Sequence, residues 1–153
     1  MTDQGHDGVS GIWAREISAQ AFDAMHQGTL PGLLDIRVVE IGPDFLRAEM
    51  PVDERHAQPF GILHGGGSVV LAETVGSFAA AMAVPAGARV VGVEVNASHL
   101  APARKGDRVS ALCRPARLGR TLQVWAIEVR RGNGTLTCVA RLTTAVQVAR
   151  PAG

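Results

Sequence analysis

The stretch from Gly65 to Ala88 constrains the fold more than any other part of the chain, because its 24 residues contain one ionisable side chain, Glu73. The remaining side chains are small or apolar, which predicts a helix that is apolar on nearly every side and therefore buried. A carboxylate in such a helix is costly unless it is paired, hydrogen-bonded or protonated. Glu73 is therefore a catalytic group or a structural carboxylate that reaches an arginine or a helix end, and the spacing leaves both interpretations open.

The length and composition of the chain predict a single domain, residues 1–153, with a sizeable hydrophobic core. A chain of 153 residues with 46% hydrophobic residues can bury such a core. The net charge of +1, without a basic run, predicts neither a nucleic-acid partner nor attraction to an anionic membrane. Residues 65–88 are long enough to span a bilayer, but their five glycines, one proline and Glu73 argue against a membrane helix.

The two cysteines, Cys113 and Cys138, lack metal-ligand spacing and stand in strand-like segments. We expect them to be reduced core residues, which predicts a cytoplasmic location and no metal site. Residues 1–11 are polar and rich in glycine, and we expect them to be disordered. They lack the order of basic and apolar residues that marks a signal peptide.

The remaining pattern predicts an α+β protein. Ser18 caps a predicted short helix, and a turn at Gly42–Asp44 indicates a hairpin. The predicted helices cover 19–27 and 65–84, and the predicted strands cover 34–41, 45–52, 89–100, 107–118, 121–131 and 135–149. An antiparallel sheet wrapped around one long central helix would cover that helix, and the open edges of the sheet favour dimerisation by strand pairing.

The start of the long helix gathers polar and flexible groups. The glycine run at 65–67 exposes backbone N–H groups that suit an oxyanion or a polarised carbonyl, although tight packing explains the run equally well. Ser77 lies four residues after Glu73, on the same helix face. Its hydroxyl would position a water or hold the carboxylate, or else bond back to the Glu73 carbonyl.

Gln58 and His64 stand just before this helix, and a lone histidine there is typical of a helix cap. No nucleophile elbow, dinucleotide fingerprint, Walker loop or metal-spaced histidine pair is present in the sequence. A carboxylate combined with backbone N–H donors suits attack on an activated acyl group. In that chemistry the carboxylate is a nucleophile or general base, and the N–H donors hold the oxyanion.

Two segments carry a resemblance to a known family. Residues 58–74 read QPFGILHGGGSVVLAET, and residues 91–100 read VGVEVNASHL, followed by Pro102 and Gly106-Asp107. The first segment closely resembles the active-site segment of hotdog-fold acyl-CoA thioesterases. The second segment resembles the same family independently. The nearest groups are the phenylacetate-pathway, the Arthrobacter-type 4-hydroxybenzoyl-CoA and the 1,4-dihydroxy-2-naphthoyl-CoA thioesterases. The resemblance covers residues 31–149 and implies a hotdog fold.

The resemblance also implies roles for five residues. Glu73 would be the catalytic carboxylate, and the Gly65 N–H would polarise the thioester carbonyl. Gln58 and His64 would bind and orient the thioester, and Ser77 would assist the carboxylate or the water. Glu73 would come from one subunit. Gln58, His64 and Gly65 would come from its partner. The minimal active unit is then a homodimer, expected to pair into a homotetramer, and it needs no cofactor because the CoA thioester is the substrate.

Contacts to the rest of the substrate follow from the same comparison. Ala101 stands where many members carry an arginine, so other basic residues must compensate if that arginine touches a CoA phosphate. The alternative for these basic residues is a solvated surface. The positions implied near CoA are Ser98, His99, Arg120 and Thr121, and the compensating residues are Arg89, Arg104 or Lys105. Independently of the resemblance, we expect specificity to depend on the shape of a pocket formed by residues such as Phe60, Leu63, Phe78 and Met82 and by the N-terminal segment.

The expected activity is hydrolysis of an acyl-CoA to a free acid and CoA. An aromatic or hydroxyaromatic acyl group is the first choice, and a medium-chain acyl group is the second. Two alternatives stay open at this point. One is a hotdog hydratase or dehydratase acting on an enoyl or hydroxyacyl thioester, and the other is a non-catalytic acyl-CoA-binding module.

Overall fold

The computed structural model of the chain describes residues 11–148. The disorder expected for residues 1–11 therefore lies outside the described residues, except at Gly11. There the chain is fixed against the turn after β1, because the Ile12 N–H donates to the Pro43 carbonyl at 3.0 Å and a Cβ on Gly11 would collide with the same oxygen.

The described chain forms three helices and six strands, in the expected order apart from the additional short helix α2. They are α1 (Ala19–His26), α2 (Leu30–Leu33), β1 (Arg37–Ile41), β2 (Leu46–Pro51), α3 (Gly65–Met82), β3 (Ala88–His99), β4 (Arg108–Leu118), β5 (Leu122–Arg131) and β6 (Leu136–Val148). Ser18 caps α1 as predicted, since its hydroxyl accepts from the Ala21 N–H at 3.0 Å. The short helix α2 was not predicted, and Pro31 lies in its first turn, where the fixed φ of proline is suitable.

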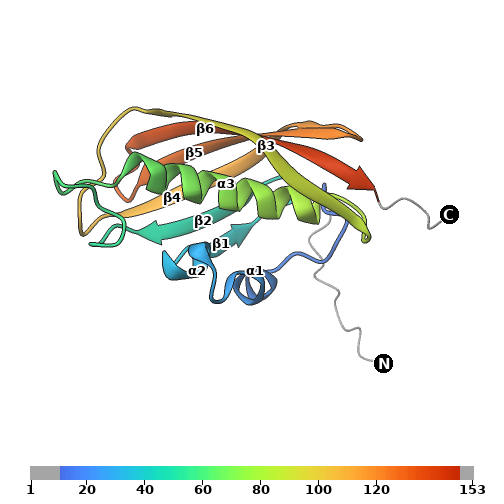
Figure 1. Cartoon of the computed structure of the whole chain (residues 1–153), viewed down its shortest axis with the longest axis horizontal. Helices are drawn as coiled ribbons and strands as arrows, with labels where there is room; N and C mark the ends of the chain where they lie inside the picture. Colours follow the sequence, from blue (N-terminus) through green and yellow to red (C-terminus); the bar gives the residue numbers. More distant parts are fainter. Residues whose placement is uncertain (1–10, 149–153) are drawn as a thin grey trace, which may run out of the picture.

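The six strands form one antiparallel sheet in the order β1-β2-β4-β5-β6-β3. In Figure 1 the sheet curls around α3, and α1 and α2 lie on the other side of that helix. This arrangement confirms the expected sheet wrapped around a central helix. Within residues 11–148, β3 pairs with β6 alone, so one edge of this twelve-residue strand stays open.

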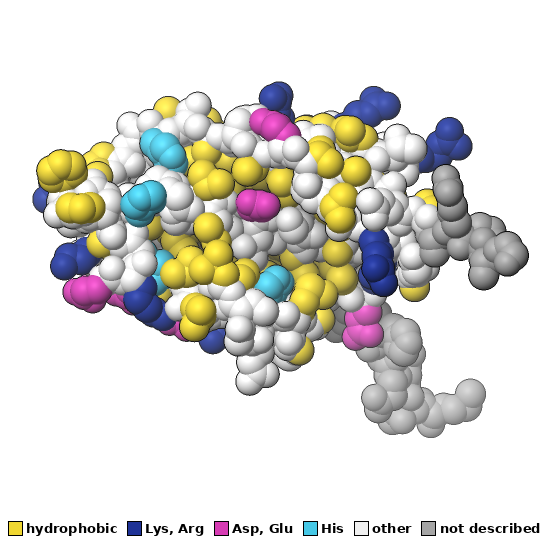
Figure 2. Space-filling model, in the orientation of Figure 1, with side chains coloured by type: hydrophobic (Ala, Val, Ile, Leu, Met, Phe, Trp, Pro, Cys, Tyr) yellow, Lys and Arg dark blue, Asp and Glu magenta, His cyan; other side chains and the backbone are white. Residues whose placement is uncertain are grey.

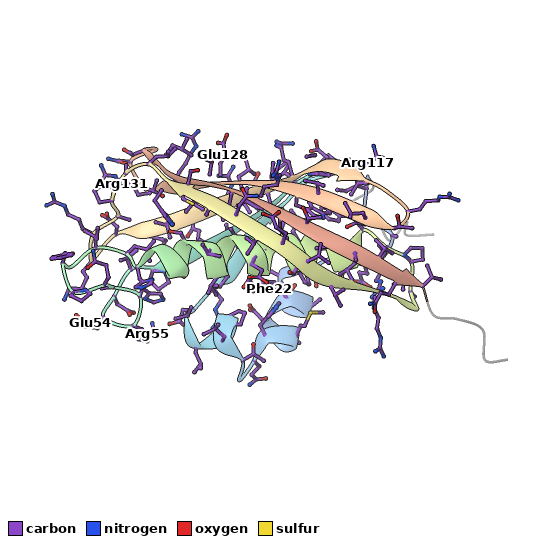
Figure 3. The ribbon with its side chains drawn as sticks, turned by 45° about the horizontal axis from the view of Figure 1, so that its top comes forward. Phe22, Glu54, Arg55, Arg117, Glu128 and Arg131 are labelled. Atoms are coloured by element: carbon purple, nitrogen blue, oxygen red, sulfur yellow. The ribbon has the colours of Figure 1, made fainter. Side chains whose placement is uncertain are left out.

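The core lies between α3 and the concave face of the sheet. Strands β2, β4 and β5 alternate buried and more exposed residues, as expected for a sheet with one covered face. The largest fully buried side chains on this face and on α3 are Trp125, Phe78, Leu46, Met50, Leu71, Ile127 and Leu142. Charged residues such as Arg117, Glu128 and Arg131 project from the opposite face, as Figure 3 shows. No helix within the described range is long and apolar enough to cross a membrane.

The complete burial predicted for α3 is wrong for the single chain. The helix is buried over most of its surface, but one stripe remains partly or fully exposed, and Glu73 is an exposed member of it. This stripe contains Gly66, Val70, Glu73, Ser77 and Ala81, which recur at helical spacing. The sheet covers most of the other sides, and Phe22 of α1 packs on Phe78, so the open stripe of α3 lies between α1 and α2 on one side and β3 on the other (Figure 1).

Candidate active site

The first turn of α3 leaves one backbone donor free. The Gly66 N–H donates to His64 Nδ1 at 2.8 Å, and the Gly67 and Ser68 N–H groups donate to the His64 carbonyl at 2.8 and 3.4 Å. Among the described residues, nothing accepts from the Gly65 N–H. Since the first N–H groups of a helix carry a partial positive charge, this donor is available to a carbonyl oxygen or an oxyanion.

His64 is the N-cap of α3, as expected for a lone histidine in that position. Its Nδ1 accepts from the Gly66 N–H, so the proton of the neutral ring is on Nε2, on an exposed side chain. Gln58 has a comparable arrangement, because its Oε1 accepts from the Phe60 N–H and its amide nitrogen therefore remains a donor. Both side chains are held by the backbone and keep free donors.

A pocket of about 480 Å³ opens at the same helix end. The imidazole of His99, the last residue of β3, covers one side of Gly65, and a Cβ at this glycine would lie 2.9 Å from His99 Nε2. The pocket is lined by Gln58, Leu63, Gly65, His99, Ala101 and Pro102, among others. The structure thus brings Gln58, Leu63, Gly65 and His99 together, and Ser98 is exposed on the adjoining end of β3.

Glu73 lines a second pocket, of about 320 Å³, together with Ser77 and His26. Glu73 Oε1 lies 3.6 Å from the position of a Cβ on Gly92, so the carboxylate is held beside the open edge strand. Within residues 11–148, Glu73 forms no ion pair or side-chain hydrogen bond. The Ser77 hydroxyl likewise makes no bond to the Glu73 carbonyl in the described chain. Neither structural alternative raised by the sequence is therefore realised here.

The carboxylate and the free N–H donor are separated along α3. Glu73 is eight residues after Gly65, which corresponds to about 12 Å of helix. One thioester carbonyl requires a donor within about 3 Å of its oxygen and an attacking group within about 3.5 Å of its carbon. The two groups of one chain are too far apart to act on the same carbonyl.

The residues expected near the CoA nucleotide lie at the other end of the sheet. Arg89 is the second residue of β3 and His99 is the last, so they are roughly 33 Å apart along the strand. Arg120 and Thr121 are exposed in the β4–β5 turn, and Arg120 lines a pocket with Ala88. Within one chain, these three residues are not brought to the pocket at the start of α3.

Two other basic residues lie beside that pocket. Arg104 and Lys105 follow Ala103, which lines it, and Lys105 forms an ion pair of 3.5 Å with Glu54. Arg104 forms no ion pair with another described residue, and its backbone pairs with Ile62. Of the residues expected to compensate for Ala101, Arg104 and Lys105 are therefore the ones close to it in the same chain. Phe60 is 89% exposed at the tip of the loop before α3.

The loop before α3 is held by a network that the sequence analysis missed. The buried His56 donates from Nε2 to the Leu34 carbonyl at 2.9 Å, and its Nδ1 lies 2.9 Å from Asp53 Oδ1. Arg55 bonds to both Asp53 and Asp35, each at 2.7 Å. Figure 3 shows Arg55 projecting from this loop. The only sequence signal is the pattern Asp53-Glu54-Arg55-His56, which is too common on protein surfaces to indicate a clamp.

The charges of this network set its pH range. Hydrogen bonding to Arg55 holds the pKa of the Asp53 carboxyl well below its usual value, and the same guanidinium lowers the pKa of Asp35. A carboxyl whose pKa is depressed in the folded protein stabilises it fully above the ordinary value of 3.8, and the effect is lost as pH falls further. The loop is therefore expected to keep its anchoring at neutral pH.

The two cysteines are far from the start of α3 in the sequence, on the two strands of the sheet that flank β5. Cys113 and Cys138 are buried free thiols on β4 and β6, as predicted, and burial raises the pKa of both. In the part of the chain that the structure describes, no three His, Cys, Asp or Glu side chains gather in a way that could hold a metal ion.

Comparison with known proteins identifies the family. The sequence profile described as Thioesterase superfamily matches residues 60–138, a range that begins at the loop before α3 and contains Gly65 and Glu73. The chain belongs to the thioesterase superfamily. Its fold is that of the hotdog thioesterases, and the expected thioester hydrolase activity is confirmed at the level of the family.

Individual thioesterases cover almost the whole domain. The chain is 51% identical to a 1,4-dihydroxy-2-naphthoyl-CoA hydrolase of Escherichia coli over 135 residues, which cover 88% of this chain and 98% of that protein. It is 44% identical to a proofreading thioesterase, EntH, of Cronobacter turicensis, with the same coverage. The crystal structure of a thioesterase from Haemophilus influenzae superposes with a TM-score of 0.87 at 42% identity, covering 90% of this chain and 95% of the other.

Proposed function

We propose that this thioesterase hydrolyses an aromatic or hydroxyaromatic acyl-CoA to the free acid and CoA. The observation that carries the proposal concerns two groups of α3 that no residue within 11–148 pairs with, the Gly65 N–H at the helix start and the carboxylate of Glu73. The sequence identity of 51% to a hydrolase named for an aromatic hydroxyacyl-CoA supports this acyl class. A medium-chain acyl group is the second candidate.

The proposed chemistry uses these two groups and needs no cofactor. The thioester oxygen accepts from the Gly65 N–H, which makes the carbonyl carbon more electrophilic and holds the oxyanion that forms. Glu73 removes a proton from the attacking water, or it attacks this carbon directly and forms a mixed anhydride that a water then hydrolyses to release the free acid and regenerate the carboxylate. The C–S bond then breaks and CoA leaves as a thiolate that takes up a proton. Gln58 and His64 supply further donors that orient the thioester, and Ser77 holds the water or the carboxylate.

We infer that the site is completed by a second copy of the chain. A partner chain that pairs antiparallel with the open edge of β3 is related to it by a two-fold axis. Glu73 lies beside Gly92, and Gly65 lies beside His99. A strand pair centred near Asn96 sets Gly92 opposite the partner subunit's His99, which brings Glu73 of one subunit to the Gly65 N–H of the other.

The proposal also includes the wider assembly and the cellular location of the protein. Two such dimers are proposed to pair into a tetramer, as the family resemblance implies. The free buried thiols of Cys113 and Cys138 suit a reducing compartment, and we propose the cytoplasm. Arg104 and Lys105 are proposed to take the place of the arginine absent at Ala101 in binding CoA phosphate.

A panel of acyl-CoA thioesters tests the reaction and the substrate class. Release of CoA is followed with a thiol reagent for benzoyl-CoA, hydroxybenzoyl-CoA, 1,4-dihydroxy-2-naphthoyl-CoA and medium-chain acyl-CoAs. We expect the highest kcat/KM among the aromatic thioesters, at about 10⁴ M⁻¹s⁻¹ or above. A higher value for the medium-chain compounds would reverse the proposed order, and the absence of CoA release from all of them would refute the proposal.

Mixing two inactive variants tests the shared site. Glu73→Ala and Gln58→Ala each remove one side of every site, but a hybrid dimer contains one site with both natural residues. Random reassociation after mixing should therefore restore about a quarter of the wild-type activity. Each variant incubated alone is the control. A mixture that stays inactive although the subunits exchange, or a protein that is monomeric by light scattering, would contradict the shared site.

A further inference from the structure

We propose that His26 is a specificity-determining residue, which accepts a hydrogen bond from a hydroxyl group on the acyl part of the substrate. The inference rests on the proposed function and extends it to one side chain. His26 is the last residue of α1, far from the motifs around α3 in the sequence, yet it lines the same pocket as Glu73 and Ser77. No catalytic step requires it, so its effect is on which acyl group fits.

The hydrogen bonding of His26 fixes which ring nitrogen is the acceptor. Nδ1 lies 2.8 Å from the carbonyl oxygen of Phe22, one helical turn earlier. A carbonyl oxygen can only accept, so Nδ1 carries the proton of the neutral ring. Nε2 is then an acceptor, and no described residue donates to it. The ring presents a hydrogen-bond acceptor without a partner from residues 11–148.

Aromatic packing holds the ring in place. The His26 and Phe22 ring centroids are 4.2 Å apart, and Phe22 meets Phe78 of α3 edge to face at 5.1 Å. Figure 3 shows Phe22 between α1 and α3. His26 is thereby attached to α3 through two fully or almost fully buried phenylalanines. An acceptor fixed in this way can distinguish ligands, because the ring does not need to be ordered when the ligand binds.

The other walls of the pocket define the ligand. Leu30, Pro31 and Val70 form apolar surface, and Glu73 is the only ionisable group besides His26. Figure 2 shows hydrophobic side chains gathered on this face of the molecule, with most Lys and Arg side chains toward its margins. An aromatic ring fits such walls. A ring that carries a hydroxyl pairs with Nε2, whereas a plain ring removes water from Nε2 and leaves it unsatisfied.

Matched thioesters and matched variants test this inference. The intact oligomer is assayed with benzoyl-CoA and with 2-, 3- and 4-hydroxybenzoyl-CoA, and the measured quantity is the ratio of kcat/KM for the best hydroxylated substrate to that for benzoyl-CoA. His26→Phe keeps the aromatic packing and removes the acceptor, and His26→Gln keeps an acceptor near the position of Nε2. Met25→Leu changes an exposed residue of the same helix that does not line the pocket.

We expect His26→Phe to lower this ratio roughly tenfold by reducing turnover of the hydroxylated substrate alone. His26→Gln should restore part of the ratio, and Met25→Leu should leave it unchanged. An unchanged ratio in His26→Phe, or an equal loss with both kinds of substrate, would overturn the inference, because the latter indicates a packing role.

A binding measurement separates this inference from the proposed function. If the wild-type protein hydrolyses none of these thioesters, the proposed function fails, but the role of His26 is still decided with the free acids. Hydroxybenzoate should shift the ¹⁵N resonance of His26 Nε2 and benzoate should not. Equal responses to the two acids, or no response to either, would overturn the inference about His26.

Discussion

Replacing Glu73 by Gln should lower kcat by about 10²–10⁴-fold or more, because the amide can be neither the general base nor the nucleophile. The substitution preserves size and should leave the fold intact, since Glu73 is exposed in the single chain and forms no ion pair or side-chain hydrogen bond with other described residues. The measurement is CoA release with the best substrate of the acyl-CoA panel. Rates are measured over substrate concentrations up to saturation, so that kcat and KM are obtained separately.

The control for this variant is Glu128→Gln, which removes a carboxylate from the outer face of the sheet, where it pairs with Arg130. That change should leave kcat within about twofold, because an exposed ion pair contributes little. Thermal unfolding and light scattering of Glu73→Gln should match the wild type. A Glu73→Gln enzyme with near wild-type turnover would end the proposed mechanism, whatever its stability.

The central helix was predictable because its sequence signals are local. The glycine run at 65–67 and Pro85 bracket an apolar segment too long for a strand, and the helix begins at Gly65 and ends at Met82. The strands were predictable for a similar reason, since turn residues such as Asn133-Gly134 separate β-branched segments. The boundaries of β3, β4, β5 and β6 lie within one residue of the predicted ranges.

The exposure of Glu73 was not predictable from the sequence. An apolar helix indicates that cover exists, but not whether the same chain or a partner provides it on each side. In this fold the sheet and α1 cover most of α3 and leave the stripe that contains Glu73 and Ser77 open. The hydrophobic pattern of the helix sequence does not mark this stripe, because Val70 and Ala81 within it are as apolar as the residues of the core.

The family motif identified the residues of the site but not their arrangement. Gly65 and Glu73 belong to one continuous motif, and the helical rise between them implies that one chain cannot use both on a single carbonyl. His26 had no sequence signal at all. It reaches the pocket through the packing of Phe22 against Phe78, and a contact between residues so far apart in sequence is set by the tertiary fold.

Removing the Gly65 N–H should be the second most damaging change, and Gly65→Pro removes it with little cost to the helix. Gly65 is the first residue of α3, where proline is favoured and where no helical hydrogen bond is lost. His64 has φ −62° and ψ 135°, which is the region that a residue before proline prefers. Gly65→Ala is the matched variant, because its Cβ meets His99 Nε2 in the same way but its N–H remains.

We expect kcat of Gly65→Pro to fall about 10²–10³-fold below that of Gly65→Ala, the usual effect of losing one oxyanion donor. Thermal unfolding should be similar for the two. Equal kcat values would show that the N–H does not hold the oxyanion and that any shared loss arises from crowding against His99.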